Sequence, residues 1–144
     1  MNILKQYIST GSRHKLLFTS HHVEEVAYVD LGYLLANGIE SYLHAKHLPV
    51  LADEAIEKII NTKVVQNSVI GDYIAIHNIG ILFEPALQLN VHSKFYAWTK
   101  TKTVIVPNTE GVIKNNIFYL AGTTDQTFSI NLSDISYNII SDEI

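Results

Sequence analysis

One short run of residues limits the possible folds more than any other part of the sequence. After Gly71 and Asp72, residues 73–76 (Tyr-Ile-Ala-Ile) place apolar side chains on both faces of an extended strand. A strand of this kind has to be covered on both sides, as a central strand is in a parallel sheet flanked by helices. The run therefore predicts an α/β fold.

Helical periodicity surrounds this strand. Asp30 is placed to cap a helix that begins near Gly32, and Asp53 is placed to cap a second helix with an apolar stripe. Pro85 suits the first turn of a third helix, which we expect to reach about Thr99. These helices alternate with strands along the first hundred residues.

Short β-rich runs fill the rest of the chain. Residues 14–19 and 25–30 have strand length, although apolar content alone does not separate them from buried helix. Turn residues separate four later runs, at 103–106, 117–120, 127–130 and 137–140. The whole pattern predicts a mostly parallel sheet flanked by helices, with a C-terminal antiparallel β extension. At 144 residues, we expect one domain spanning 1–144.

The charge content bears on the partners of the protein. Charged residues make up 17% of the chain, against a usual share of about 25%, so apolar surface should remain exposed. Such patches often mark interfaces, and we expect a protein partner or a homo-oligomer. A net charge of −4 argues against nucleic acid as a partner, although a modest basic region is formed by Lys94, Lys100, Lys102 and Lys114.

Cysteine content and hydropathy bear on the compartment. The chain contains no cysteine, which excludes disulfides and thiolate metal sites and fits a reducing compartment. Its first residues lack the apolar core of a signal peptide, and the longest apolar stretch, residues 73–83, is about half of a membrane span. We expect a cytoplasmic protein without a membrane segment.

Common catalytic and nucleotide-binding motifs are absent. Neither GxxxxGK[ST] nor GxGxxG occurs, and residues 20–25 contain no glycine that would let backbone amides wrap a phosphate. No GxSxG elbow is present. We therefore expect no cofactor, and the sequence favours a non-catalytic role.

Histidines suggest one candidate metal site. The densest group is His21-His22-x-Glu24-Glu25, in which His21, His22 and Glu24 are the candidate ligands. Adjacent side chains on a strand point to opposite faces, so these residues could share a metal only in a loop or a distorted segment. A second pair, His44 and His47, has an i, i+3 spacing on the helix expected from Gly32. The alternative interpretation, solvated surface histidines, is the one that the sequence favours.

Residues 73–90, YIAIHNIGILFEPALQLN, carry the most distinctive pattern. The stretch resembles the second-half motif of the small P-loop ATPase-like protein of bacterial BREX phage-defence systems, in which a strand ending in an acidic residue and Asn precedes a Leu-Phe turn, a Pro and a helix. The matching positions are Asn78, Leu82, Phe83, Pro85 and Leu87.

The resemblance extends through the β-rich tail with Tyr119 and covers roughly the last half of the chain. His77 stands where the family carries a magnesium-binding aspartate, and the phosphate loop has no counterpart. A neutral imidazole is a poor ligand for that hard cation. The resemblance thus implies a shortened relative with a degenerate P-loop fold that has lost nucleotide hydrolysis.

These observations lead to one main hypothesis and two alternatives. The main hypothesis is a non-catalytic accessory or protein-interaction domain of a bacterial cytoplasmic assembly, with phage defence as its implied context. The first alternative is a small metal-dependent or nucleotide-handling enzyme built from dispersed residues, with Glu25 and His77 added to the three candidate metal ligands. The other is a regulator that binds nucleic acid through the lysines near Lys100.

Overall fold

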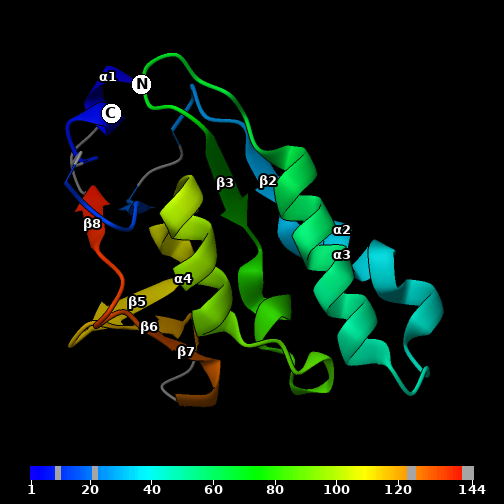
Figure 1. Ribbon diagram of the computed structural model, residues 1–144. Coiled ribbons are helices and arrows are strands. Elements are labelled where there is room, and N and C mark those ends of the chain that lie inside the picture. Colours follow the sequence, from blue (N-terminus) through cyan, green and yellow to red (C-terminus); the bar gives the residue numbers. More distant parts are fainter. Residues whose placement is uncertain (9–10, 21–22, 123–125, 141–144) are drawn as a thin grey trace.

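The centre of the molecule is a sheet of five parallel strands in the order β2-β3-β4-β1-β8. The computed structural model describes residues 1–8, 11–20, 23–122 and 126–140. The sheet is built from β1 (Leu16–Thr19), β2 (Tyr28–Asp30), β3 (Tyr73–His77), β4 (Thr103–Pro107) and β8 (Tyr137–Ile140). A separate antiparallel sheet of three strands lies between β4 and β8 in the chain. The predicted fold class is confirmed (Figure 1).

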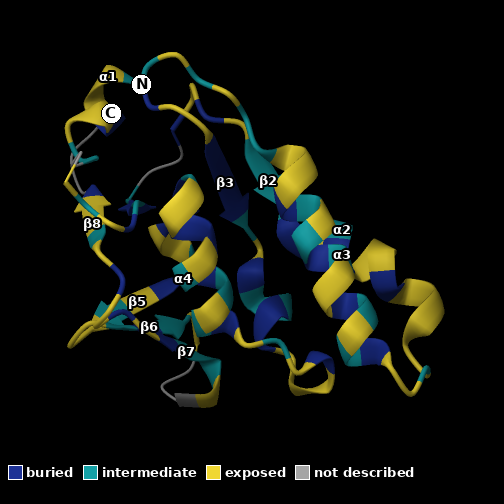
Figure 2. Ribbon diagram, viewed as in Figure 1, coloured by how far each residue is buried: buried dark blue, intermediate teal, exposed yellow. Residues whose placement is uncertain are grey.

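Strand β3 is buried on both faces, as its sequence predicts. Ile74 and Ile76 belong to the core on one side of the sheet, whereas Tyr73 and Ala75 belong to the core on the other. Each of these side chains is at most 2% exposed, and the strand is dark throughout this stretch in Figure 2. The alternation of strand side chains thus supplies both cores.

Helices cover one face of the sheet. They are α2 (Leu31–Ile39), α3 (Leu48–Lys63) and α4 (Val91–Thr101), and their buried residues share one core with Ile74 and Ile76. In Figure 1, β3 is seen between α4 and α3, and both helices lie nearer to the viewer than the strand. Among the described segments, no helix has the length and apolar character needed to cross a bilayer.

The first two helices differ from the sequence-based expectation. Asp30 caps α2, accepting a hydrogen bond from the Tyr33 N–H at 3.0 Å, as predicted. However, α2 ends at Ile39 and is followed by the 3₁₀ helix η1 (Glu40–Tyr42). Asp53 does not cap α3, because Pro49 already occupies its first turn and the helix begins at Leu48.

The third helix begins later than expected. Pro85 starts only the short 3₁₀ helix η3 (Pro85–Leu87), which follows η2 (Ile79–Phe83). Gln88 has a left-handed backbone with φ of +50°, which interrupts helical geometry. Asn90 then caps α4 by accepting a hydrogen bond from the Ser93 N–H at 3.0 Å.

The opposite face of the sheet is covered by α1 (Asn2–Lys5) and by segments without regular structure. Leu17 of β1 and Ile105 of β4 pack there with Leu4, Val23 and Ile70. This cover is largely irregular, whereas helices on both faces were expected.

The antiparallel sheet consists of β5 (Gly111–Lys114), β6 (Ile117–Leu120) and β7 (Ser129–Asn131). Asn115 and Asn116 both have positive φ, +52° and +61°, as a two-residue type I′ hairpin requires. Phe118 stacks on Phe18 of β1 at 5.4 Å between ring centroids and thereby joins this sheet to the main core. Short 3₁₀ helices, η4 (Asn108–Glu110) and η5 (Gln126–Phe128), precede β5 and β7.

The last β-rich run, residues 137–140, does not extend this small sheet. It forms β8, which returns to the main sheet and pairs parallel with β1, placing Leu16 opposite Tyr137. Only the strands between β4 and β8 make up the antiparallel extension.

Candidate functional site

The structure does not assemble the metal site suggested by the sequence. His21 and His22 lie outside the described residues. Glu24 is exposed, and Glu25 is exposed and forms an ion pair with the amino group of Met1. Within the described part of the chain, no group of three His, Asp or Glu side chains is arranged to hold a metal ion.

The other histidine pair is also separated by the fold. His44 follows η1, whereas His47 precedes the first residue of α3, and both are exposed. Their i, i+3 spacing would align them only on one continuous helix. The early end of α2 removes that alignment.

Polar residues meet where β2 and β3 end. Asp30 lies opposite His77 in the parallel register, and the Asn78 Nδ2 atom donates to Asp30 Oδ1 at 2.8 Å. The hydrogen bonds from the Tyr33 N–H and then from Asn78 lower the pKa of Asp30. Asn78 itself has a left-handed backbone with φ of +56°. These contacts cap α2 and tie two strand ends together, so they have a structural role.

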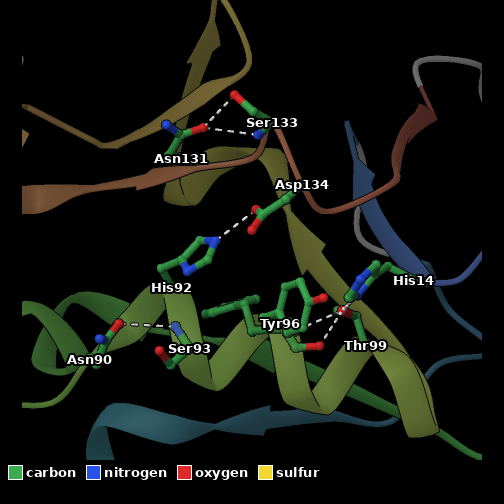
Figure 3. Close-up of polar contacts among 10 residues, drawn as sticks. His14, Asn90, His92, Ser93, Tyr96, Thr99, Asn131, Ser133 and Asp134 are labelled. Carbon is green, nitrogen blue, oxygen red and sulfur yellow. Dashed lines mark hydrogen bonds and ion pairs between the residues drawn. The ribbon is translucent and has the colours of Figure 1, made fainter.

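A second polar group, named here the α4 polar row, comprises His92, Tyr96, Thr99 and Lys100 of α4 together with His14 and Asp134, which contact them. His92 and Tyr96 occupy successive turns of one helix face, and the His92 Nε2 atom lies 2.7 Å from Asp134 Oδ1 (Figure 3). The Tyr96 ring lies 4.5 Å from the ring of His14, and Lys100 Nζ lies 4.4 Å from the Tyr96 ring centroid. The hydrogen bond from His92 lowers the pKa of Asp134.

His14 is the buried member of the α4 polar row. Its Nδ1 atom lies 2.9 Å from Thr99 Oγ1, and that hydroxyl donates its proton to the Phe95 carbonyl at 2.7 Å. Nδ1 must therefore donate, which leaves Nε2 as an acceptor with no partner among the described residues. Burial lowers the pKa of His14, because the charged imidazolium loses its hydration there.

The α4 polar row contains a His–acid pair but no activated nucleophile within the described residues. The nearby Ser133 hydroxyl lies 2.6 Å from Asn131 Oδ1, and that carboxamide oxygen also accepts from the Ser133 N–H. A serine nucleophile would have to reach the imidazole instead. The contacts of His92 and Asp134 therefore join α4 to the segment that follows β7.

A third polar cluster joins α3 to α4. Lys94 forms ion pairs with Asp53 and, at 3.0 Å, with Glu57, whose oxygens also accept from Trp98 Nε1. Burial of the Lys94 amine opposes its charged form, yet these hydrogen bonds outweigh burial and raise its pKa. The ion pairs balance the positive charge of Lys94, and Lys100 lies over an aromatic ring. The expected basic region is therefore weaker than its lysine count indicates.

A largely apolar groove of about 640 Å³ lies between α2 with η1 and the η2–η3 segment and is named here the α2 groove. Ile39, Leu48 and Leu87 are at most 7% exposed and form its base. Its rim carries two carboxylates, Glu40 and Glu84. A groove of this size and lining suits an apolar ligand or side chains of a partner.

Exposed apolar side chains gather around the α2 groove. Leu43 lines it and is 54% exposed, and Tyr33 lies one turn before the groove-lining Ala36 on the same face of α2 with 63% exposure. Tyr42, in η1, is 45% exposed. Water thus contacts three large apolar side chains in the segment from α2 to the residue after η1.

Comparison of the chain with protein-family models, with curated proteins and with solved structures gives no match. The functional assignment therefore depends on the geometry of the chain.

Proposed function

We propose that this chain is a non-catalytic protein-interaction domain of a bacterial cytoplasmic assembly, and that the assembly acts in phage defence. The observation that carries the proposal is the α2 groove with its exposed apolar rim. Exposing the apolar parts of Tyr33, Tyr42 and Leu43 to water is unfavourable, and a partner that covers them removes this cost. The phage-defence context comes from the resemblance of residues 73–90 to the BREX protein.

The test is a tagged pull-down from native host cells, combined with light scattering of the purified chain. We expect either a stoichiometric protein partner or a stable oligomer, and we expect Leu43→Gln to reduce that association at least about tenfold. Val112→Thr is the matched control, because Val112 is 51% exposed on the small sheet, away from the α2 groove. A monomer that recovers no partner would contradict the proposal.

One observation favours a second function, binding of a nucleotide or another small ligand at the end of β1. The hydroxyl groups of Thr19 and Ser20 are buried and lack hydrogen-bond partners among the described residues. Ligands of parallel α/β sheets bind beyond the carboxyl ends of the strands, which is where these hydroxyls lie. Calorimetry with ATP, GTP and Mn²⁺ tests this function; saturable binding that Thr19→Val abolishes would support it, and the absence of heat would reject it.

A further inference from the structure

We infer that the α2 groove binds an amphipathic helix of a partner protein whose apolar stripe is flanked by lysine or arginine. This inference rests on the proposed function and names the class of partner that the domain recognises.

The walls of the groove favour a helical guest. Its lining comes from α2, η1, the first residue of α3, η2, η3 and the adjoining turns, and it includes no strand residue. An extended peptide would find no strand edge there with which to pair its backbone N–H and C=O groups. A helix brings those groups already satisfied and needs only an apolar surface.

The apolar lining matches one stripe of such a helix. Ile39, Leu48 and Leu87 offer a closed base, while Leu43 stands at the side and is half exposed. Tyr33 extends the same wall by one helical turn. Side chains at i, i+3, i+4 and i+7 of a guest helix form an apolar stripe that such a lining can cover.

The charges of the rim determine what flanks the stripe. Glu40 belongs to the α2 side of the groove and Glu84 to the η2–η3 side, and both are exposed. The lining residues include no Lys, Arg or His. A guest helix therefore meets a carboxylate on each flank, which favours cationic side chains and disfavours acidic ones.

The cleft between α3 and α4 lacks this uniform charge. Its volume is about 480 Å³, but Lys94 lies in it beside Asp53 and Glu57. A basic helix would there meet a cation as well as carboxylates, so this cleft does not share the charge preference of the α2 groove.

The experiment uses two synthetic peptides of about five helical turns with the same leucine stripe, one with lysine flanks and one with glutamate flanks. Fluorescence anisotropy with the full chain should show the lysine peptide binding at least about tenfold more tightly than the glutamate peptide. The double variant Glu40→Lys/Glu84→Lys should reverse this order, and Val112→Thr should leave it unchanged. Circular dichroism verifies folding, and Glu84→Lys alone replaces the double variant if that variant unfolds.

Equal binding of the two peptides, no binding of either, or an order that the charge reversal does not alter would overturn the inference. The pull-down described for the proposed function separates the two failures. Suppose that the chain still recovers a stoichiometric partner or forms a stable oligomer, and that Leu43→Gln disrupts this association. The interaction role then stands, and only the basic helix is excluded.

Discussion

Gly32 is held against Asn78 where α2 begins. A Cβ atom at Gly32 would lie 2.3 Å from Asn78 Nδ2 and 2.8 Å from the Asn78 backbone oxygen, and the Asn78 side chain is fixed by its bond to Asp30. Alanine usually favours a helix over glycine by roughly 1 kcal/mol. We nevertheless expect Gly32→Ala to lower the free energy of unfolding by about 1–3 kcal/mol, measured by urea denaturation, because of this overlap.

Gly38 provides the control in the same helix. A Cβ atom there would lie 3.6 Å from the Ala55 Cβ atom, an ordinary van der Waals contact. Gly38→Ala should therefore raise the free energy of unfolding by about 0.4–1 kcal/mol. If both alanine variants were stabilised, the close approach of α2 to Asn78 would be wrong.

His14 should make the folded state sensitive to mild acid. Burial is the main cause of its lowered pKa; the nearby Arg13 and Lys100 charges lower it further, and Asp134 opposes them. As pH falls below about 6.5, the unfolded chain takes up a proton at His14 before the folded chain does. The stabilisation is therefore complete above that pH and is lost as pH falls towards the folded-state pKa.

The measurement is a series of urea unfolding curves from about pH 7.5 to about pH 5.0 for the parent chain and His14→Gln. Glutamine is uncharged throughout, so the parent chain should lose more stability than the variant over this interval. Parallel pH profiles of the two proteins would show that His14 does not titrate differently on folding.

At the scale of elements, Lys94 links α3 to α4 through Glu57. Lys94→Met removes the cation, and Glu57→Gln removes the charge while keeping an oxygen for Trp98 Nε1. A double-mutant cycle of these two substitutions should give a coupling energy of about 0.5–1 kcal/mol, as for a partly exposed ion pair.

Salt provides the check on this cycle. Concentrated NaCl screens charges that water reaches, so the coupling should shrink at about 1 M salt. A coupling energy near zero at low salt would mean that the Lys94–Glu57 pair contributes nothing to the packing of α3 against α4.

The types of most elements could be predicted from the sequence, whereas several of their ends could not. Periodicity identified β3 and the apolar face of α3, because each depends on residues close in the chain. The start of α4 depends instead on the left-handed Gln88, which no local propensity indicates. Similarly, Asp53 is a good capping residue, but Pro49 begins α3 earlier and Asp53 pairs with Lys94 from another helix.

At the scale of the whole molecule, the order of the strands could not be predicted from the sequence. The pairing of β8 with β1 joins segments about 120 residues apart, and a β-rich run has the same pattern in either sheet. The α2 groove was missed for a related reason. Its lining comes from residues 36–48 and 81–87, which helical folding and the core bring together. Only the low charge content indicated that some apolar surface would remain exposed.

The most direct test of the account is an NMR titration of the ¹⁵N-labelled chain with the lysine-flanked peptide. The interaction role and the basic-helix inference predict saturable shift changes concentrated in residues 33–48 and 79–87, with little change in the α4 polar row. An absence of shift changes would contradict the assignment of the α2 groove as a site for a basic helix, and changes centred on His92 and Asp134 would contradict its assignment as the interaction surface.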